Sequence, residues 1–152
     1  MKKAVIFSLI SIMLLPMLLL SCKTSNTKVP AINGGQEAKI IDLMLDDFQT
    51  QNNIVKDVAL VRPGHLIVRL GANPSTGYQW GEADISGTEI VAQESRQYVA
   101  PQNTKLVGAA GTDVWVFDSK AAGATKISFS YSRPWEGGEK NTFTLTINVT
   151  VQ

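Results

Sequence analysis

The chain has 152 residues, about the size of one domain, and its 44% hydrophobic and 18% charged residues are ordinary for a globular protein. Fourteen Lys and Arg against thirteen Asp and Glu give a formal net charge of +1, so there is no basic excess for binding nucleic acid. One His and one Cys are too few for most metal sites, which use three or four such ligands, and they exclude an intrachain disulfide. We therefore expect no metal, no cofactor and no nucleic-acid partner.

The N-terminal segment has the layout of a secretory signal peptide. Lys2 and Lys3 precede an apolar run over residues 4–20, which is shorter than the roughly 20 residues of a membrane-spanning helix. The run ends in Leu-Leu-Ser followed by Cys22, which resembles a bacterial lipobox, where the cysteine is lipidated and becomes the first mature residue. The alternatives are an ordinary signal peptide with an unrelated cysteine, and a signal anchor.

These features predict the organisation of the chain. We expect a lipoprotein signal peptide over residues 1–21, then a lipidated Cys22 that begins a flexible tether over residues 22–37, which are small, polar and contain Pro and Gly. One folded domain follows over residues 38–152. The expected location is the bacterial cell envelope, with a monomeric domain anchored to a membrane by its lipid.

From about residue 39 the chain alternates apolar and polar residues, which is typical of half-buried strands. The alternation is clearest over residues 142–151, where most of the polar positions are Thr, a good strand former. Shorter runs of this kind cover residues 41–46, 66–70 and 126–131, and residues 114–117 are another short run of strand-forming residues. The run over residues 41–46 also fits an amphipathic helix, and residues 46–56 form an irregular link without a clear pattern.

Turn-forming residues separate these runs, and no segment after Leu20 has the apolar stripe of a long helix. About seven short strands in roughly 110 residues predict an all-β fold, an antiparallel β-sandwich of immunoglobulin-like kind. Trp80 is the candidate for the buried aromatic residue of its core, although the usual disulfide is absent.

The first candidate site segment lies between two expected strands and consists of Asn73, Pro74, Ser75, Thr76, Gly77 and Tyr78. Pro74 fixes φ, Gly77 permits positive φ, and the Asn, Ser and Thr side chains can bond neighbouring backbone. These properties predict a stiff projecting loop. On local chemistry alone, a well-made turn without a binding role is the better explanation.

Two later segments are also candidates for binding. The second consists of Gly108, Ala109, Ala110 and Gly111, small residues that present bare backbone to a partner. The third consists of Arg133, Pro134 and Trp135, and Trp and Arg are enriched at binding hot spots. The alternatives are a flexible hairpin connection for the second segment and a Trp folded back over the sheet end for the third.

In this order and spacing, the three segments resemble the chagasin family of protein inhibitors of papain-like cysteine peptidases. That family has an N-P-[ST]-[ST]-G-[aromatic]-x-W loop, a G-x-x-G loop and an R-P-W loop. This sequence has NPSTGYQW at 73–80, GAAG at 108–111 and RPW at 133–135. The first motif is fairly specific and the others are weak alone, and the two alanines depart from more glycine-rich versions. The resemblance covers about residues 39–152.

The resemblance implies a reversible competitive inhibitor whose three loops plug the peptidase cleft. The first loop would sit over the catalytic cysteine–histidine pair, with Ser75 and Thr76 nearest the chemistry. The second loop would run along the substrate groove with strand-like backbone hydrogen bonds. Trp135 would contact an aromatic surface on the far side of the cleft, with Pro134 holding it and Arg133 beside it.

Two other functions fit parts of the sequence. A lipid-anchored adhesion module without inhibitory activity would use Trp135 and Tyr78 to stack on a ligand. An enzyme would need His65 as its base, with Ser75 and Asp113 completing a triad, but Ser75 lacks the context of a nucleophile elbow. His65 follows Pro and Gly, so we expect a solvated turn histidine and a protein that is not an enzyme.

Overall fold

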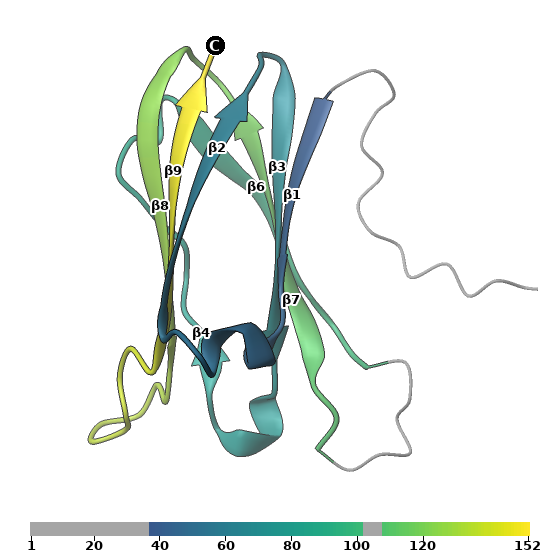
Figure 1. The fold of residues 1–152 in the computed structure, drawn as a ribbon, viewed down its shortest axis with the longest axis vertical. Helices are drawn as coiled ribbons and strands as arrows, with labels where there is room; N and C mark the ends of the chain where they lie inside the picture. Colours follow the sequence, from purple (N-terminus) through teal and green to yellow (C-terminus); the bar gives the residue numbers. More distant parts are fainter. Residues whose placement is uncertain (1–36, 102–107) are drawn as a thin grey trace, which may run out of the picture.

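The computed structural model describes residues 37–101 and 108–152, which form a two-layer β-sandwich (Figure 1). The signal peptide expected over residues 1–21, the lipidation of Cys22 and nearly all of the tether lie outside the described residues. Neither of the two short helices in the described part of the chain has the length or hydrophobicity to span a membrane.

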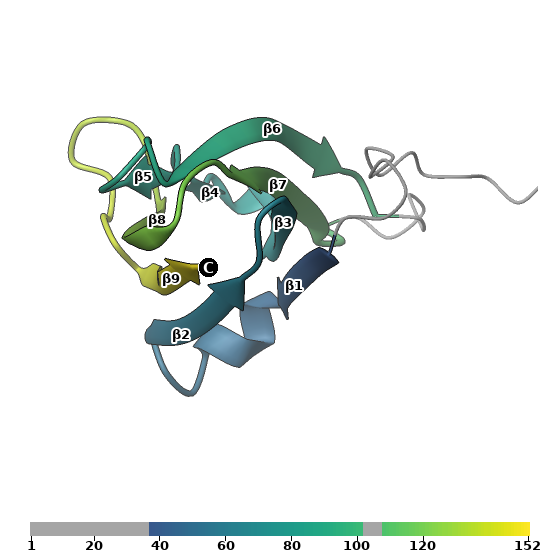
Figure 2. The same ribbon diagram turned by 90° about the horizontal axis from the view of Figure 1, so that it is seen from above.

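Two sheets face each other, as the view in Figure 2 shows. The first has the strand order β1-β3-β7-β6, made of β1 (Glu37–Leu43), β3 (Gly64–Ala72), β7 (Gly111–Ser119) and β6 (Val91–Val99). The second has the order β2-β9-β8-β4, made of β2 (Asn53–Leu60), β9 (Phe143–Val151), β8 (Gly123–Ser132) and β4 (Gln79–Trp80), and β5 (Asp84–Ile85) also pairs with β8. Two 3₁₀ helices, η1 (Leu45–Phe48) and η2 (Pro74–Thr76), lie in the connections.

The core between the sheets follows the alternation of the sequence. In β9, every second residue from Leu145 to Val151 is buried. In β8, Ile127, Phe129 and Tyr131 are buried on the matching face. Trp80 is fully buried, which confirms its predicted place in the core.

The all-β, immunoglobulin-like sandwich is confirmed, but it differs from the prediction in two details. The described residues form nine strands rather than about seven, and two of these strands contain only two residues. Both sheets are mixed rather than purely antiparallel, because β1 runs parallel to β3 and β2 runs parallel to β9. The chain turns back through η1 into the other sheet and returns by a short turn, so β1 and β3 have the same direction.

The segment between β1 and β2 is more ordered than predicted. Residues 41–43 are strand, and the helical alternative is wrong for them, although η1 begins at Leu45. The expected irregular link over residues 46–56 contains most of η1 and the start of β2. Phe48 of η1 is fully buried, with its ring centroid 5.3 Å from those of both Trp80 and Phe143, so this segment closes one end of the core.

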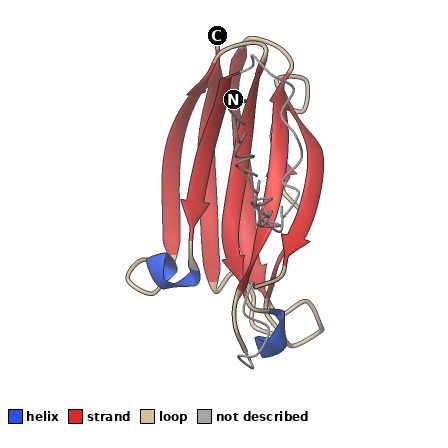
Figure 3. Cartoon of the chain, turned by 90° about the vertical axis from the view of Figure 1, so that its right-hand side faces the viewer, coloured by secondary structure: helices blue, strands red, loops and turns tan. Residues whose placement is uncertain are grey.

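Strand register places the three candidate segments at the same end of the sandwich. Ala72 pairs with Gly111 and Gln79 pairs with Ser132, so the segments that follow or precede these residues emerge together. We call this end, made of residues 73–78, 108–110 and 133–142, the loop end; it is the end that carries both 3₁₀ helices in Figure 3. The far end consists of residues 61–65, 86–94 and 118–123.

Candidate functional site

The first loop, residues 73–78, is closed by its own side chains. The Asn73 carbonyl accepts hydrogen bonds from the Thr76 amide at 3.1 Å and from the Thr76 hydroxyl at 2.7 Å. The Ser75 hydroxyl donates to Asn73 Oδ1 at 2.6 Å. Gly77 adopts a φ of 80°, which favours glycine and ends η2. Ser75 and Thr76 remain exposed, so the loop presents a stiff polar surface to a partner.

Asn73 also connects the first loop to its neighbours. Its side-chain Nδ2 donates to the Gly108 carbonyl at 2.8 Å, and its backbone amide donates to the Tyr131 hydroxyl at 3.1 Å. Gly108 and Ala110 are exposed, as expected of a second loop. Gly111 differs from the prediction because it is buried and is the first residue of β7, where it pairs with Ala72.

The third loop carries an exposed tryptophan that is seated on the first loop. Trp135 is 50% exposed, and its ring packs so closely on Gly77 that a Cβ there would lie 2.6 Å from Trp135 Cη2. The Arg133 guanidinium lies 4.5 Å from the ring centroid of Tyr78 and 5.7 Å from that of Trp135, within the range of cation–π contacts. The outer edge of the Trp135 ring is therefore seated on Gly77, while half of the side chain is exposed and available to a partner.

Two residues outside the three motifs hold the third loop in place. Lys140 Nζ donates to the carbonyl oxygens of Arg133 at 2.6 Å and of Trp135 at 3.0 Å. The Tyr78 hydroxyl donates to the Glu139 carboxylate, and this hydrogen bond to a negative group raises the pKa of Tyr78. Sequence reasoning missed both residues, because a charged pair after two glycines in a turn has no distinctive pattern.

A layer of aromatic rings lies directly beneath the loops. The centroid of the Tyr131 ring is 5.6 Å from that of Tyr78, 5.0 Å from that of Trp80 and 5.8 Å from that of Phe143. The indole N–H of Trp80 donates to the Gly71 carbonyl at 2.9 Å, one residue before the end of β3. The first and third loops therefore rest on the same buried support.

The three residues of the alternative catalytic triad do not come together. His65 lies in β3 at the far end, about 23 Å along the strand from Ala72 and the first loop. Asp113 is buried, which raises its pKa, and its side-chain partner is Arg96, whose Nη2 lies 3.4 Å from Asp113 Oδ2. The Ser75 hydroxyl is bonded to Asn73.

The expectation of a solvated turn histidine is also wrong. The His65 side chain is 13% exposed, and its Nδ1 lies 2.7 Å from Oδ1 of Asp118. The reason is that β3 begins at Gly64, two residues before the apolar alternation begins, so His65 pairs with Asp118 across the sheet.

A family model and known proteins match most of the described part of this chain. A family model described as the chagasin family peptidase inhibitor I42 matches residues 64–147, which include all three motifs. Chagasin from Trypanosoma cruzi is 33% identical over 91 residues, which cover 57% of this chain and 82% of chagasin. Amoebiasin-2 from Entamoeba histolytica is 31% identical over 85 residues, which cover 56% of this chain and 68% of that protein.

Solved structures share the fold. The cysteine protease inhibitor EhICP2 from Entamoeba histolytica superposes with a TM-score of 0.60 at 24% identity, over 78% of this chain and 100% of that one. PbICP-C, whose structure was solved in complex with falcipain-2, gives a TM-score of 0.54 at 18% identity, over 76% of this chain and 99% of that one. At these identities the likeness concerns the architecture of the sandwich.

Proposed function

This chain belongs to the chagasin family of peptidase inhibitors, and we propose that it is a reversible, competitive protein inhibitor of papain-like cysteine peptidases and not an enzyme. The observation that carries this proposal is the joining of all three motifs into one surface at the loop end. Asn73 bonds to Gly108 of the second motif, and Gly77 contacts Trp135 of the third.

The first loop is the part that we propose covers the catalytic cysteine and histidine. Its hydroxyls are turned back onto Asn73, so the loop keeps its shape without a partner. A loop that is already ordered loses little conformational entropy on binding, so an interface of standard size, about 1,600 Å², can bind tightly. Inhibition then follows because the wedge fills the cleft without presenting an oriented scissile bond to the nucleophile.

The second and third loops supply the flanking contacts. The exposed backbone around Gly108 and Ala110 suits strand-like hydrogen bonding along the substrate groove. Trp135 offers a large, half-exposed indole, seated at its outer edge on Gly77 and held through its backbone carbonyl by Lys140, for an aromatic surface on the other side of the cleft.

The proposal is tested by titrating the purified protein against papain with a fluorogenic peptide substrate, and against a trypsin-type serine peptidase as the control. We expect loss of papain activity that is overcome by more substrate, and no effect on the serine peptidase. If several papain-like peptidases keep full activity at micromolar protein, the loops bind another ligand and the adhesion module becomes the better hypothesis.

The role of the first loop is tested separately by Thr76→Arg. A bulky charged side chain at this exposed position would clash in the cleft and lose its hydration there, so the inhibition constant should rise by at least about tenfold. Thr88→Arg is the matched control, because Thr88 is an exposed threonine in the turn between β5 and β6 at the far end. Equal inhibition by both variants would show that the first loop does not enter the cleft.

We also propose that the protein is a monomeric lipoprotein of the bacterial cell envelope. The support is the sequence alone: an apolar run after two lysines, a lipobox-like Leu-Leu-Ser before Cys22, and a polar tether before the domain. Expression of the full chain in a bacterium should place it in the membrane fraction with a lipid on Cys22, detectable by mass spectrometry. Cys22→Ser should release the protein from that fraction, and its retention there would contradict the lipid anchor.

A further inference from the structure

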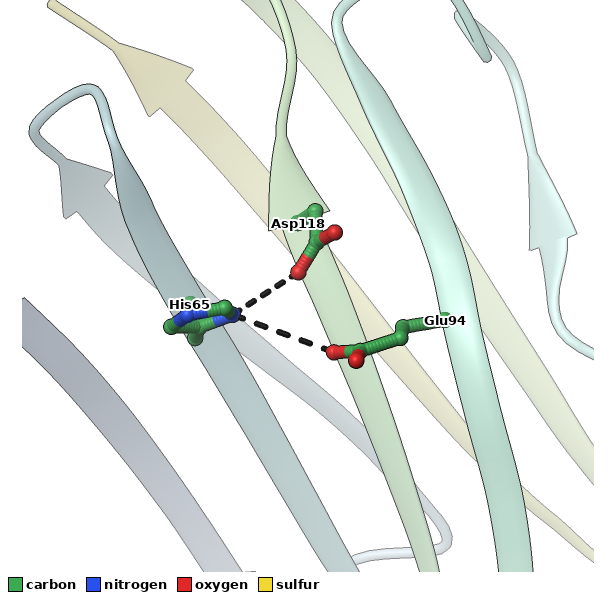
Figure 4. A group of neighbouring side chains, drawn as sticks. All are labelled: His65, Glu94 and Asp118. Carbon is green, nitrogen blue, oxygen red and sulfur yellow. Dashed lines mark hydrogen bonds and ion pairs between the residues drawn. The ribbon is translucent and has the colours of Figure 1, made fainter. Parts of the chain in front are cut away.

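A second group of polar side chains lies at the far end of the sandwich, away from the loops. His65 of β3, Glu94 of β6 and Asp118 of β7 point toward one another (Figure 4). His65 Nδ1 lies 2.7 Å from Asp118 Oδ1 and 4.0 Å from Glu94 Oε2. One donor atom from each residue lies within 4.8 Å of the other two.

Strand pairing explains how these residues meet. His65 and Asp118 are direct partners in the register of β3 and β7, so their side chains lie on the same face of the sheet. Glu94 is the extra residue of a β-bulge in β6, because Gln93 and Ser95 pair with consecutive residues of β7. A bulge changes the direction of a side chain, and such bulges are frequent beside functional sites.

We propose that His65, Glu94 and Asp118 form a binding site for a divalent transition-metal ion of the zinc class. One imidazole nitrogen and two carboxylate oxygens are ligands that Zn²⁺ accepts, with water completing the coordination. Tetrahedral ligands at about 2.1 Å from the metal lie about 3.4 Å from one another. The observed separations of 2.7 and 4.0 Å bracket this value, and the exposed Glu94 side chain can move to adjust them.

The hydrogen bond between His65 and Asp118 can be replaced by metal coordination without net loss of a proton. When Nδ1 donates to Asp118, the neutral imidazole carries its proton on that nitrogen. Moving the proton to Nε2 leaves the Nδ1 lone pair for the metal and frees Asp118 Oδ1 as a second ligand. The expectation of no metal rested on the single His and Cys, and it did not count carboxylates brought together by strand pairing.

The surroundings of the group also suit a bound cation. Lys120 Nζ donates to Asp118 Oδ2 at 2.9 Å, which leaves Oδ1 directed toward His65. A hydrogen bond of this kind to the second oxygen orients a metal-binding carboxylate. Two carboxylates and one ammonium leave a local excess of one negative charge. The group lies in a surface hollow that is also lined by Pro63, Gly64, Ser119 and Lys120, so an ion can reach it from solvent.

The site is tested by calorimetric titration of Zn²⁺ into the purified full-length protein, prepared without a histidine tag and in a buffer that does not chelate metals. We expect one ion per chain, a rise in the thermal unfolding midpoint, and reversal by EDTA. His65→Ala should weaken binding by at least about tenfold, and Glu94→Gln should weaken it as well. Glu89→Gln, which removes an exposed carboxylate elsewhere at the far end, should bind like the wild type, and Cys22→Ser should too.

The proposal fails if Zn²⁺ does not bind, or if His65→Ala binds it as tightly as the wild type. Tighter binding of Ca²⁺ or Mg²⁺ than of Zn²⁺ would also overturn it, because those ions prefer oxygen ligands and would not need the imidazole. Inhibition of papain should be the same for His65→Ala and the wild type, because His65 lies at the opposite end from the proposed peptidase-binding loops.

Discussion

The two ends of the sandwich are built from the same strands but are held together by different forces. At the loop end, ring packing and hydrogen bonds to backbone join residues distant in sequence, as in the contact of Trp135 with Gly77 and the bond from Asn73 to Gly108. At the far end, ionisable side chains join neighbouring strands, as in the hydrogen bond between His65 and Asp118. Packed rings fix the shape of a surface, whereas a group of ionisable side chains that includes the exposed Glu94 can adjust to an ion, so each end suits a different kind of partner.

The largest effect should come from removing the support beneath the loops. Trp80→Ala deletes a fully buried indole and its hydrogen bond to Gly71, so the free energy of unfolding should fall by about 3–5 kcal/mol, measured by urea denaturation. At temperatures where the variant remains folded, its inhibition constant for papain should also rise, because the first and third loops lose a shared base.

Phe117→Ala is the matched control for Trp80. Phe117 is also fully buried, but it lies beside Asp118 toward the far end. It should lose stability to a comparable extent of about 3–5 kcal/mol, with little change in inhibition by the folded protein. Equal changes in inhibition for the two variants would mean that the aromatic layer has no special relation to the loop end.

The second largest effect should be on binding alone. Trp135→Ala removes a half-exposed ring and should raise the inhibition constant by about 30-fold or more, equivalent to at least about 2 kcal/mol if the ring is a hot spot. The free energy of unfolding should change far less than for Trp80→Ala. Val55→Ala, at a 59% exposed residue of β2, is the control and should leave inhibition unchanged. An unchanged inhibition constant for Trp135→Ala would remove this residue from the interface.

A smaller effect is expected from alanine substitutions at two glycines, which distinguish the cost of backbone strain from the loss of the contact between the first and third loops. Gly77 and Gly137 both have positive φ, 80° and 71°, so alanine at either position costs on the order of 1 kcal/mol of stability. Only at Gly77 would the new Cβ meet Trp135, whereas at Gly137 it would meet nothing within 4 Å. Gly77→Ala should therefore weaken inhibition more than Gly137→Ala does. Equal inhibition by the two variants would show that the contact of Trp135 with Gly77 does not contribute to peptidase binding.

The strands that the sequence predicts have at least one face buried in the core. β9 and β8 keep a strict alternation because one side of each packs in the core. β2 and β6 were missed because both are edge strands with many exposed residues, and the bulge at Glu94 interrupts the period of β6. Hydrophobic alternation reports burial, so it is weak where a strand is mostly exposed.

The sequence also predicts only part of the candidate site. Local motifs with Pro, Gly and Trp identified the three loop segments, because turn chemistry depends on adjacent residues. The bonds from Lys140 close the third loop on itself, but a single lysine in a turn has no distinctive pattern. The bond between Tyr78 and Glu139 depends on where the third loop lies relative to the first, which no local pattern records. The same holds for His65, Glu94 and Asp118, which are far apart in sequence and are joined only by strand register.

The smallest predicted effect concerns the bond between Tyr78 and Glu139. This bond raises the pKa of Tyr78 above its ordinary value of about 10. A raised pKa in the folded state contributes stability below the pKa of the unfolded chain, and this stability is lost as the pH rises through the folded value.

The raised pKa can be tested by an alkaline titration followed by the ultraviolet absorbance of tyrosinate. In this titration, Tyr78→Phe should remove the component that ionises above the ordinary range. Glu139→Gln should shift that component to lower pH, because the amide carries no charge to oppose ionisation, while Glu89→Gln should leave it in place. If the titrations of Glu139→Gln and the wild type coincide, the third loop is held by Lys140 and the packing of Trp135, without a contribution from Glu139.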